Sequence, residues 1–246
     1  MTTRVSVAMA TYNGEKYIKE QLDSILAQIS GQDEIVISDD KSTDSTIDII
    51  NSYNDNRIRV VSGPQNGIIA NFENAILHSE GEIIFLSDQD DIWVENKLKR
   101  VLSEFENNPN RVLIMHDAKV VNETLEKNIY ESFFEFRKSK NGKWYNIYKN
   151  SFMGCCMAFR RELVERFIPI PRDIQMHDQW IGLISEIEFG RTLLLKDKLI
   201  LYRRHRDCAS DFEHNSLMKM IRNRLLLIYR LNQRKRGVRK ENGKEK

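Results

Sequence analysis

The sequence predicts an α/β protein with a central, mostly parallel sheet and helices on both of its faces. The first hundred residues alternate short β-branched segments with segments of helical periodicity, which is the pattern of a parallel sheet. One segment, 83–86, is four apolar residues in succession, as in a strand buried on both faces. Hydrophobic residues make up 41% of the 246 residues and charged residues 30%, which is typical of a soluble globular protein with one sheet-centred core.

The first half of the chain has the clearest periodicity. Ile18, Leu22 and Ile25 recur at helical spacing, and each apolar run is bounded by polar or turn residues. These patterns predict strands over 5–10, 34–38, 57–61 and 82–87 and helices over 17–28, 43–54 and 68–78.

The second half is less regular. Residues 125–150 are aromatic and basic without a clear period, and we expect a mobile or inserted segment there. Elsewhere the sequence predicts strands over 111–115, 191–195 and 199–203 and helices over 95–105, 160–167, 178–187 and 215–234. We expect a donor-binding half over 1–110, an acceptor-binding half of the same domain over 111–212, and a basic amphipathic helix and tail over 213–246.

Ligands of open parallel sheets bind beyond the carboxyl ends of the strands. Four polar loops follow predicted strands there: 11–14, 39–42, a segment around 65–67, and the loop that begins at Asp88. We therefore expect the chemistry of this protein at one edge of the sheet.

Three carboxylates follow the strand at 82–87: Asp88, Asp90 and Asp91. Strand alternation would direct Asp88 and Asp90 to the same side, and carboxylates ~5 Å apart repel by roughly 3 kcal/mol at an effective dielectric of ~20. Oxygen ligands suit Mg²⁺ or Mn²⁺, which would relieve this repulsion and bind a substrate phosphate. The structural alternative is an exposed acidic turn before a helix.

Asp39 and Asp40 follow another predicted strand and precede a helix. A carboxylate at that position is placed to accept a hydrogen bond from a pyrimidine imide. Ser42 or Thr43 is the candidate cap of the following helix.

Four segments together resemble the ordered signature of family 2 glycosyltransferases. They are 7–14 (VAMATYNG), 37–44 (ISDDKSTD), 66–72 (NGIIANF) and 86–93 (LSDQDDIW). The resemblance covers roughly residues 4–210, and the last segment is similar to that of bacterial rhamnosyltransferases of surface polysaccharide synthesis.

The resemblance implies a GT-A type fold, a nucleotide-sugar donor and inversion at the anomeric carbon. It implies that Asp90 binds the metal at the diphosphate and that Asp91 could substitute for Asp88 or Asp90. His205, after the predicted strand at 199–203, would approach the metal or the diphosphate. The donor-nucleotide site would comprise Thr11, Tyr12, Asn13, Asp39 or Asp40, Asn66, Asn71 and Asp88.

Inversion by a single displacement needs one general base near the acceptor hydroxyl. Asp178 matches the family's base, and its structural alternative is an N-cap carboxylate. The resemblance also implies acceptor or phosphate contacts by five residues: Gly154, Cys155, His177, Trp180 and Arg204. The structural alternative for Arg204 is a solvated basic edge.

The C-terminus has a different composition from the rest of the chain. From Lys219 onward there are 11 Lys/Arg and 2 Asp/Glu, whereas the preceding residues hold 27 basic and 34 acidic side chains. Leu217, Ile221, Leu225 and Ile228 form one apolar stripe, which we expect to pack on the domain. The basic tail suits either an anionic membrane surface or a solvated terminus, and no nucleic-acid recognition module accompanies it.

No apolar run approaches the ~20 residues of a membrane-spanning helix, and the N-terminus enters a strand without a signal-peptide pattern. The three cysteines, Cys155, Cys156 and Cys208, fit no metal or disulfide framework and suit a reducing cytosol. We expect a cytoplasmic protein that is either free or peripheral on the inner face of the cell membrane.

The function that these observations favour is sugar transfer, most specifically of rhamnose, from a dTDP- or UDP-linked donor to a glycan or lipid-linked oligosaccharide acceptor, with Mg²⁺ or Mn²⁺. Two alternatives stay open. One is a Mg²⁺-dependent phosphatase or nucleotidyltransferase, although Ile92 stands where an aspartyl-phosphate phosphatase would place a threonine. The other is a nucleotide- or carbohydrate-binding module without catalysis.

Overall fold

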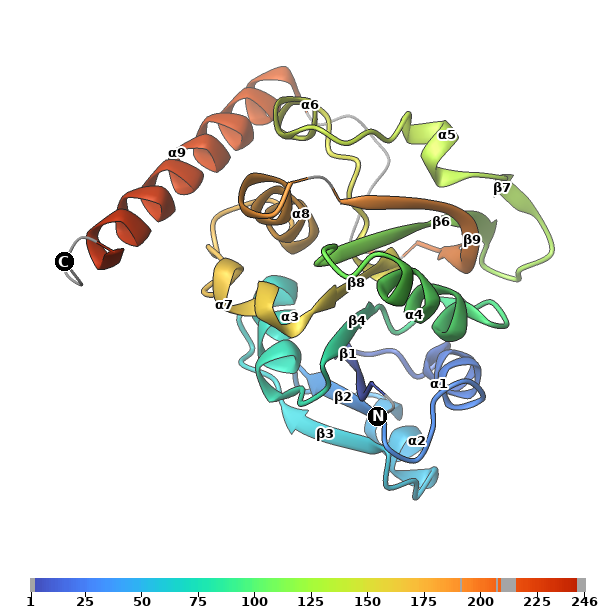
Figure 1. Cartoon of the computed structure of the whole chain (residues 1–246). Helices are drawn as coiled ribbons and strands as arrows, with labels where there is room; N and C mark the ends of the chain where they lie inside the picture. The colour runs from blue at the N-terminus through green and yellow to red at the C-terminus, as the bar shows by residue number, and fades with distance from the viewer. Residues whose placement is uncertain (1–2, 191, 207, 209–215, 243–246) are drawn as a thin grey trace.

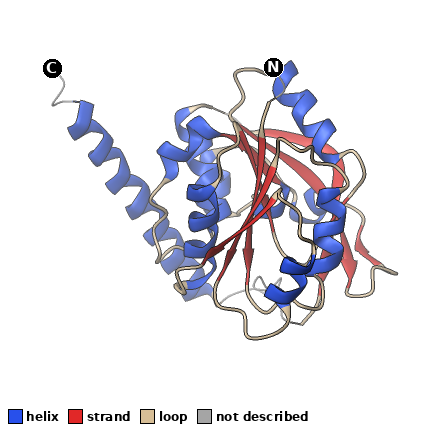
Figure 2. Ribbon diagram, turned by 90° about the horizontal axis from the view of Figure 1, so that it is seen from below, coloured by secondary structure: helices blue, strands red, loops and turns tan. Residues whose placement is uncertain are grey.

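The computed structural model describes residues 3–190, 192–206, 208 and 216–242, with 235–242 described by their backbone alone. Its strands form one nine-stranded sheet in the order β3-β2-β1-β4-β8-β6-β9-β5, and β7 pairs with β6 outside this path. Helices lie on both sides of the sheet (Figure 1, Figure 2). The predicted α/β class is therefore confirmed.

The first four strands are parallel to one another. They are β1 (Val5–Thr11), β2 (Glu34–Asp39), β3 (Ile58–Ser62) and β4 (Ile83–Ser87). β1 pairs with β2 and β4, and β2 pairs with β3, all in the parallel sense. The connections contain α1 (Ile18–Leu26), α2 (Thr46–Ser52) and α3 (Gly67–His78). The carboxyl ends of these strands consequently share one edge of the sheet.

Antiparallel pairings join the second half of the chain to the first. β8 (Met157–Arg160) lies between β4 and β6 (Leu113–Asn122) and is antiparallel to both. β9 (Leu193–Arg204) is parallel to β6 and antiparallel to β5 (Ile92–Trp93), with Ile92 opposite Leu201. This register brings the loop before β5 to the carboxyl end of β9. Helix α4 (Lys97–Asn107) precedes β6, and α7 (Val164–Phe167) and α8 (His177–Glu188) lie between β8 and β9.

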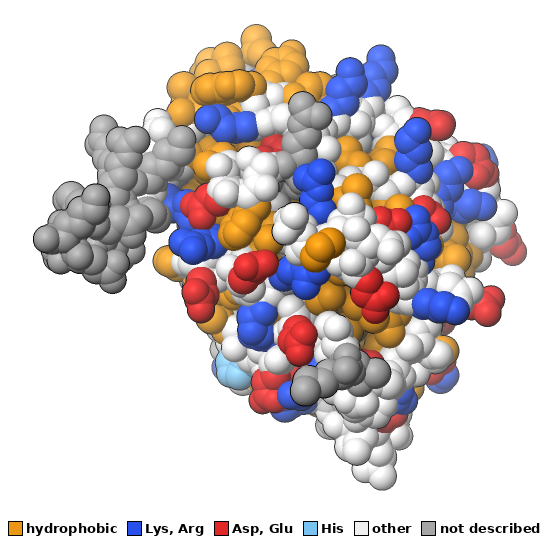
Figure 3. All heavy atoms as spheres, viewed as in Figure 1, with side chains coloured by type: hydrophobic (Ala, Val, Ile, Leu, Met, Phe, Trp, Pro, Cys, Tyr) orange, Lys and Arg blue, Asp and Glu red, His pale blue; other side chains and the backbone are white. Residues whose placement is uncertain are grey.

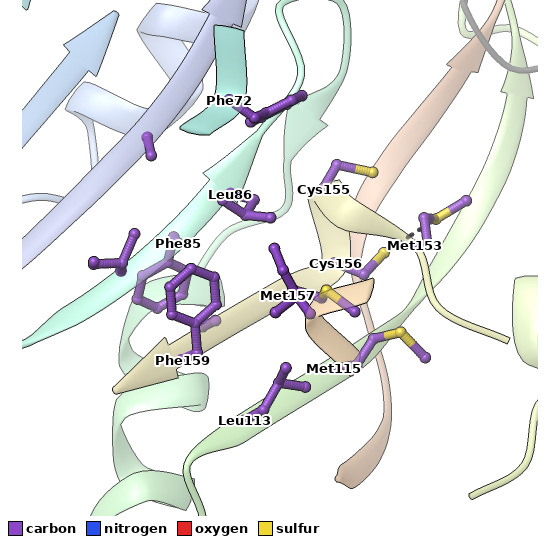
Figure 4. Close-up of a cluster of buried hydrophobic side chains, with 14 of the residues drawn as sticks. Phe72, Phe85, Leu86, Leu113, Met115, Met153, Cys155, Cys156, Met157 and Phe159 are labelled. Carbon is purple, nitrogen blue, oxygen red and sulfur yellow. Dashed lines mark hydrogen bonds between the residues drawn. The ribbon is translucent and has the colours of Figure 1, made fainter. Parts of the chain in front are cut away.

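One part of the core lies where β4, β8 and β6 meet. Figure 4 shows aromatic, aliphatic and sulfur-containing side chains from these strands, from α3 and from the segment before β8 packed together, and all of those labelled are buried. Cys155 and Cys156 belong to this cluster, within a 3-10 turn (Gly154–Cys156) that precedes β8. The turn thus rests on a rigid apolar base beside the carboxyl end of β4.

Several predictions of individual elements were wrong. The strands predicted at 191–195 and 199–203 form the single strand β9, which absorbs two register shifts against β6, although Arg191 lies outside the described residues. The segment 125–150 contains β7 (Asn128–Tyr130), α5 (Phe133–Arg137) and α6 (Lys143–Tyr148). These elements are too short to show a period in sequence. Neither Ser42 nor Thr43 caps α2, which begins three residues later at Thr46.

The helix predicted at 215–234 is α9 (Leu217–Asn242), and it packs on the domain with a different face from the predicted one. Leu217, Ile221 and Leu225 of the predicted stripe are exposed, whereas Leu227 and Leu231 are buried. Asn215 lies outside the described residues.

Polar contacts explain this orientation of α9. Arg230 forms a bidentate ion pair with Asp173, with the shorter contact at 2.6 Å. Arg224 donates to the carbonyl oxygen of Tyr148 at 2.7 Å. These contacts rotate Leu227 inward and leave Leu225 in solvent. Within the described part of the chain, no helix is both long enough and apolar enough to cross a membrane.

The docking of α9 can be tested with two neighbouring leucines. Leu227 is 4% exposed and Leu225 is 64% exposed. We expect Leu227→Ala to weaken the docking of α9 by roughly 2–5 kcal/mol, because a buried leucine loses contacts and leaves a cavity. Leu225→Ala should stay within about 0.5 kcal/mol of the wild type. Hydrogen exchange of the α9 amides measures both, and equal effects of the two substitutions would contradict this orientation.

Candidate active site

A cavity of about 1070 Å³ lies at the carboxyl edge of the parallel strands. It is lined by residues of both predicted halves and by one face of α9. Several predicted site residues line it: Thr11, Tyr12, Asn71, Asp88, Asp90, Gly154, His177 and Asp178. The cavity therefore brings together side chains that are as far apart in sequence as Thr11 and Asp178.

The loop that carries the acids is fixed by hydrogen bonds to the first half of the chain. β4 ends at Ser87, as predicted, and the acids lie in the loop that follows it. Gln21 of α1 donates to Ser87 Oγ at 2.7 Å and to the carbonyl oxygen of Asp88 at 2.9 Å. Gln89 makes two 3.0 Å hydrogen bonds with the backbone of Tyr12. The loop is thus held rigidly against β1.

Arg203 secures the same loop from the other side, and sequence reasoning missed this role. Its backbone N–H donates to Asp91 Oδ1 at 3.0 Å, and its Nε donates to the carbonyl oxygen of Asp90 at 2.9 Å. It also forms an ion pair with Glu20 of α1. This arginine is buried, so its charge offsets part of the negative charge of the acid loop.

Asp88 and Asp91 lie close together beside Cys155. One ligand atom from each of the three lies within 4.8 Å of the others. Burial, followed by the charges of Asp90 and Asp178, raises the pKa of Asp88 to about 7. Burial and the charges of Asp90 and Asp88 likewise raise the pKa of Asp91 well above its ordinary value. The acids therefore destabilise one another in the absence of a cation.

Lys97 of α4 is the buried cation below this pair. Its Nζ donates to the carbonyl oxygen of Cys155 at 3.0 Å and lies 4.2 Å from the centre of the Trp93 ring. Burial lowers the pKa of Lys97 to about 8, and the nearby charges of Asp91 and Asp88 oppose that decrease. A lysine inside an otherwise polar helix carries no sequence signal that distinguishes it from a surface lysine.

Asp90 lies on the other side of the loop and meets the end of β9. His205 Nε2 is 2.7 Å from Asp90 Oδ2, and the His205 ring packs on that of Tyr17 with centroids 4.6 Å apart. Cys208 Sγ joins them, because one ligand atom from each of Asp90, His205 and Cys208 lies within 4.8 Å of the others. Ligand atoms ~2.0–2.3 Å from one ion are roughly 3–4 Å apart, so this group of donors fits a divalent cation.

Asp39 and Asp40, which follow β2, have different environments. Asp39 is buried, and its Oδ1 accepts from Thr11 Oγ1 at 2.9 Å and from Ser42 Oγ at 2.6 Å. Asp40 lines the cavity. Asn71 is buried at the wall, where its Oδ1 has no hydrogen-bond partner among the described residues. Asp40 and Asn71 therefore present acceptors to a ligand, whereas Asp39 shapes the loop.

Asp178 occupies the opposite wall, in the first turn of α8. It is buried and lies 3.5 Å from Asn150 Nδ2. Burial raises the pKa of Asp178 to about 6, and hydrogen bonds and the charge of Arg137 limit the increase. The N-cap position of α8 is Met176, so Asp178 does not fill the N-cap role that was its structural alternative.

His177 precedes Asp178 in α8, and its ring stacks on Phe72 at a centroid distance of 4.2 Å. Neither ring nitrogen of His177 has a hydrogen-bond partner among the described residues. Burial lowers its pKa to about 4, so the ring is neutral. A Cβ built on Gly154 would lie 2.9 Å from His177 Nε2, which explains why a glycine faces this ring.

Five other predicted site residues are not among those that line the cavity: Asn13, Asn66, Cys155, Trp180 and Arg204. Trp180 is buried and donates from Nε1 to the carbonyl oxygen of Phe167 at 2.8 Å, and Cys155 lies in the core cluster of Figure 4. Arg204 donates to the hydroxyl of Tyr202 at 3.4 Å. Asn13 accepts from the backbone N–H of Thr43 at 2.8 Å. Asn66 is exposed at the N-cap position of α3.

Comparison with known proteins adds independent observations. The sequence model described as Glycosyl transferase family 2 matches residues 6–168. The chain is 26% identical to the Escherichia coli UDP-Glc:alpha-D-GlcNAc-diphosphoundecaprenol beta-1,3-glucosyltransferase WfgD, over 88% of the chain and 89% of WfgD. It is 28% identical to the Shigella flexneri dTDP-rhamnosyl transferase RfbG, over 80% of the chain and 71% of RfbG.

Among solved structures, S. aureus TarS 1-349 in complex with UDP-GlcNAc is similar to this chain. The TM-score is 0.68 at 20% identity, over 92% of the chain and 66% of TarS 1-349. This likeness confirms the predicted GT-A type fold. The chain spans 65% and 59% of the length of the first curated relatives that it matches.

The repulsion among the acids gives a testable consequence for stability. Because the folded-state pKa of Asp88 lies above its unfolded value, its contribution to stability is fully present below about pH 4 and is lost as the pH rises through about 7. In a chelator-containing buffer at pH 8, Asp88→Asn should therefore raise stability by about 1–2 kcal/mol, or roughly 2–8 °C in Tm.

Thermal unfolding at pH 4 and pH 8 measures this difference. At pH 4 the wild type and Asp88→Asn should unfold at the same temperature. The matched control is Asp48→Asn on the exposed side of α2, which should change neither value. A lower Tm for Asp88→Asn at pH 8 would show that the carboxylate is stabilising and would contradict the repulsion.

Proposed function

This chain belongs to glycosyl transferase family 2, and on that premise we propose that it is a metal-dependent, inverting glycosyltransferase of bacterial surface polysaccharide synthesis. The observation that carries the proposal is the placement of Asp90 and Asp178 in one cavity. A diphosphate site and a general base must both contact one bound donor–acceptor pair. In this cavity Asp90, from the first half of the chain, would serve the diphosphate site, and Asp178, from the second half, would serve as the base.

The donor nucleotide would bind on the side formed by β1 and β2. Tyr12 is 57% exposed beside the cavity and offers a ring on which a base can stack. Asp40 presents a carboxylate that can accept from a pyrimidine imide, and Asn71 Oδ1 lacks a partner that a nucleotide hydroxyl would supply. A uridine or thymidine diphosphate satisfies all three.

Asp90 and His205 would hold the divalent ion, with Asp88 beside the ribose and diphosphate. A bound Mg²⁺ or Mn²⁺ would neutralise charge on the departing nucleoside diphosphate. The buried Arg203 and Lys97 keep the acid loop in place before the donor arrives. These two cations are internal, so they would hold the loop and not the phosphate.

Asp178 would take the proton of the acceptor hydroxyl. With a pKa of about 6, the Asp178 carboxylate is largely ionised at neutral pH. This pKa is close to the operating pH, as is best for a general base. The neutral His177 beside it offers a ring nitrogen to a sugar hydroxyl. Gly154 leaves room for the acceptor to approach this pair.

Rhamnose is the donor sugar that we propose, from a dTDP- or UDP-linked precursor, and a lipid-linked glycan is the proposed acceptor. The similarity to proteins named as a dTDP-rhamnosyl transferase and as a diphosphoundecaprenol glucosyltransferase supports these choices. A lipid-linked acceptor requires the cavity to reach a membrane surface.

The surface around α9 supports peripheral membrane contact. Its exposed apolar face comprises Leu217, Met218, Ile221, Leu225 and Tyr229. In Figure 3 hydrophobic side chains gather at the top of the molecule, where Figure 1 places α6 and the first half of α9. Trp144 and Tyr148 of α6 are also exposed. Aromatic side chains beside basic ones suit the interface of an anionic bilayer. The side chains of the basic tail from Lys235 onward lie outside the described residues.

The role of the proposed base can be tested with Asp178→Asn. We expect a loss of roughly 10²–10⁴-fold in sugar transfer, because the amide cannot accept the acceptor proton. Binding of UDP or dTDP should be unchanged, which separates lost catalysis from misfolding. Asp48→Asn serves as the control for a removed surface charge. Transfer at the wild-type rate by Asp178→Asn would remove this residue from the base role.

Membrane contact can be tested by vesicle flotation of the full chain. Replacing Leu217, Ile221 and Leu225 together with serine should weaken binding to anionic phospholipid vesicles at least ~100-fold, since each buried aliphatic side chain contributes about 1.5–3 kcal/mol. The control is Leu77→Ser, an exposed leucine at the far end of α3. If the triple variant floats with vesicles as the wild type does, this face of α9 is not the contact.

A further inference from the structure

Cys208 is a cavity residue that the proposed function does not use. It follows the end of β9, is half-buried, and lines the cavity. Its thiol is positioned by two long contacts, a donation from the backbone N–H of His205 at 3.4 Å and one to the carbonyl oxygen of Arg203 at 3.6 Å. Cys155 and Cys156, by contrast, are fully buried in the core.

The position of this thiol is set by the strand pairing. β5 and β9 are antiparallel with Ile92 opposite Leu201, so Asp90 is carried to the residues that follow β9. Asp90 Oδ2 is there 2.7 Å from His205 Nε2, and the Cys208 sulfur lies within 4.8 Å of the ligand atoms of both. Three different donors, one oxygen, one nitrogen and one sulfur, thus converge from two segments 115 residues apart.

We propose that Cys208 is a third protein ligand of the divalent ion held by Asp90 and His205. On binding, the thiol releases its proton to solvent and the thiolate sulfur donates an electron pair to the ion. Thiolate and imidazole favour transition ions, whereas Mg²⁺ prefers oxygen ligands and water. The site therefore selects an ion such as Mn²⁺, Co²⁺ or Zn²⁺ over Mg²⁺.

The inference rests on the proposed metal-dependent function. Titration with Co²⁺ tests the assignment of Cys208 separately from that function, because a thiolate ligand gives Co²⁺ a charge-transfer absorption in the near ultraviolet. The full chain is titrated with Co²⁺ and, separately, with Mg²⁺ in the presence of UDP. We expect the absorption in the wild type and in the control Cys156→Ala. Cys208→Ser should abolish this absorption and weaken Co²⁺ binding at least ~tenfold, because even the loss of a residue that only hydrogen-bonds to a metal ligand typically costs that much affinity. The affinity for Mg²⁺ should not fall to the same extent.

A second variant tests the selectivity itself. Cys208→Asp should bind Co²⁺ without the thiolate absorption and should bind Mg²⁺ more tightly than the wild type does, because the third donor becomes an oxygen. An absorption that persists in Cys208→Ser, or that disappears in Cys155→Ala instead, would overturn the assignment of Cys208. Co²⁺ binding without any thiolate absorption would overturn it while leaving the proposed function intact. A wild type that binds neither ion would refute both.

Discussion

The mutual repulsion of the carboxylates that follow β4 is the constraint on which the rest of this structure depends. Asp88 and Asp91 lie within 4.8 Å of each other beside a buried turn, and burial raises the pKa of both. The fold tolerates this repulsion because Arg203 holds the loop through Asp90 and Asp91 and Lys97 lies below it. Such a loop is costly in a protein without a cation and becomes favourable when a divalent ion binds, which couples the stability of the loop to ligand binding.

The sheet brings the parts of the site together through two kinds of pairing. Parallel strands in the first half place Thr11, Asp40 and Asp88 at one edge, as this topology requires. Antiparallel β8 then attaches the second half beside β4, so that Gly154, His177 and Asp178 face the same cavity. The proposed donor and acceptor subsites therefore come from different halves of one continuous sheet. The cavity also reaches α9 through Met220 and Leu227, on the face opposite the exposed leucines.

The sequence was sufficient to predict what local patterns encode. The α/β class and the acid loop were predicted from strand–helix alternation, whereas the roles of Asp178 and His205 were implied by the family resemblance and stay predictions. Arg203 and Lys97 were missed because a buried cation looks like any surface cation when its partners are distant in sequence. The prediction of which face of α9 packs on the domain was wrong. Residues 225–228 are four apolar residues in a row, so periodicity alone cannot decide whether Leu225 or Leu227 is buried. The metal ligand proposed at Cys208 was missed because its two partners are set by strand register and not by cysteine spacing.

The central claim is that the acids after β4 bind a nucleoside diphosphate through a divalent ion. Calorimetric titration of the full chain with UDP or dTDP, in Mn²⁺ and then in excess chelator, tests it most directly. The account predicts binding in Mn²⁺ that weakens at least ~tenfold, about 1.4 kcal/mol, both on chelation and in Asp90→Asn. Equal affinity of the wild-type chain with and without Mn²⁺ would contradict it.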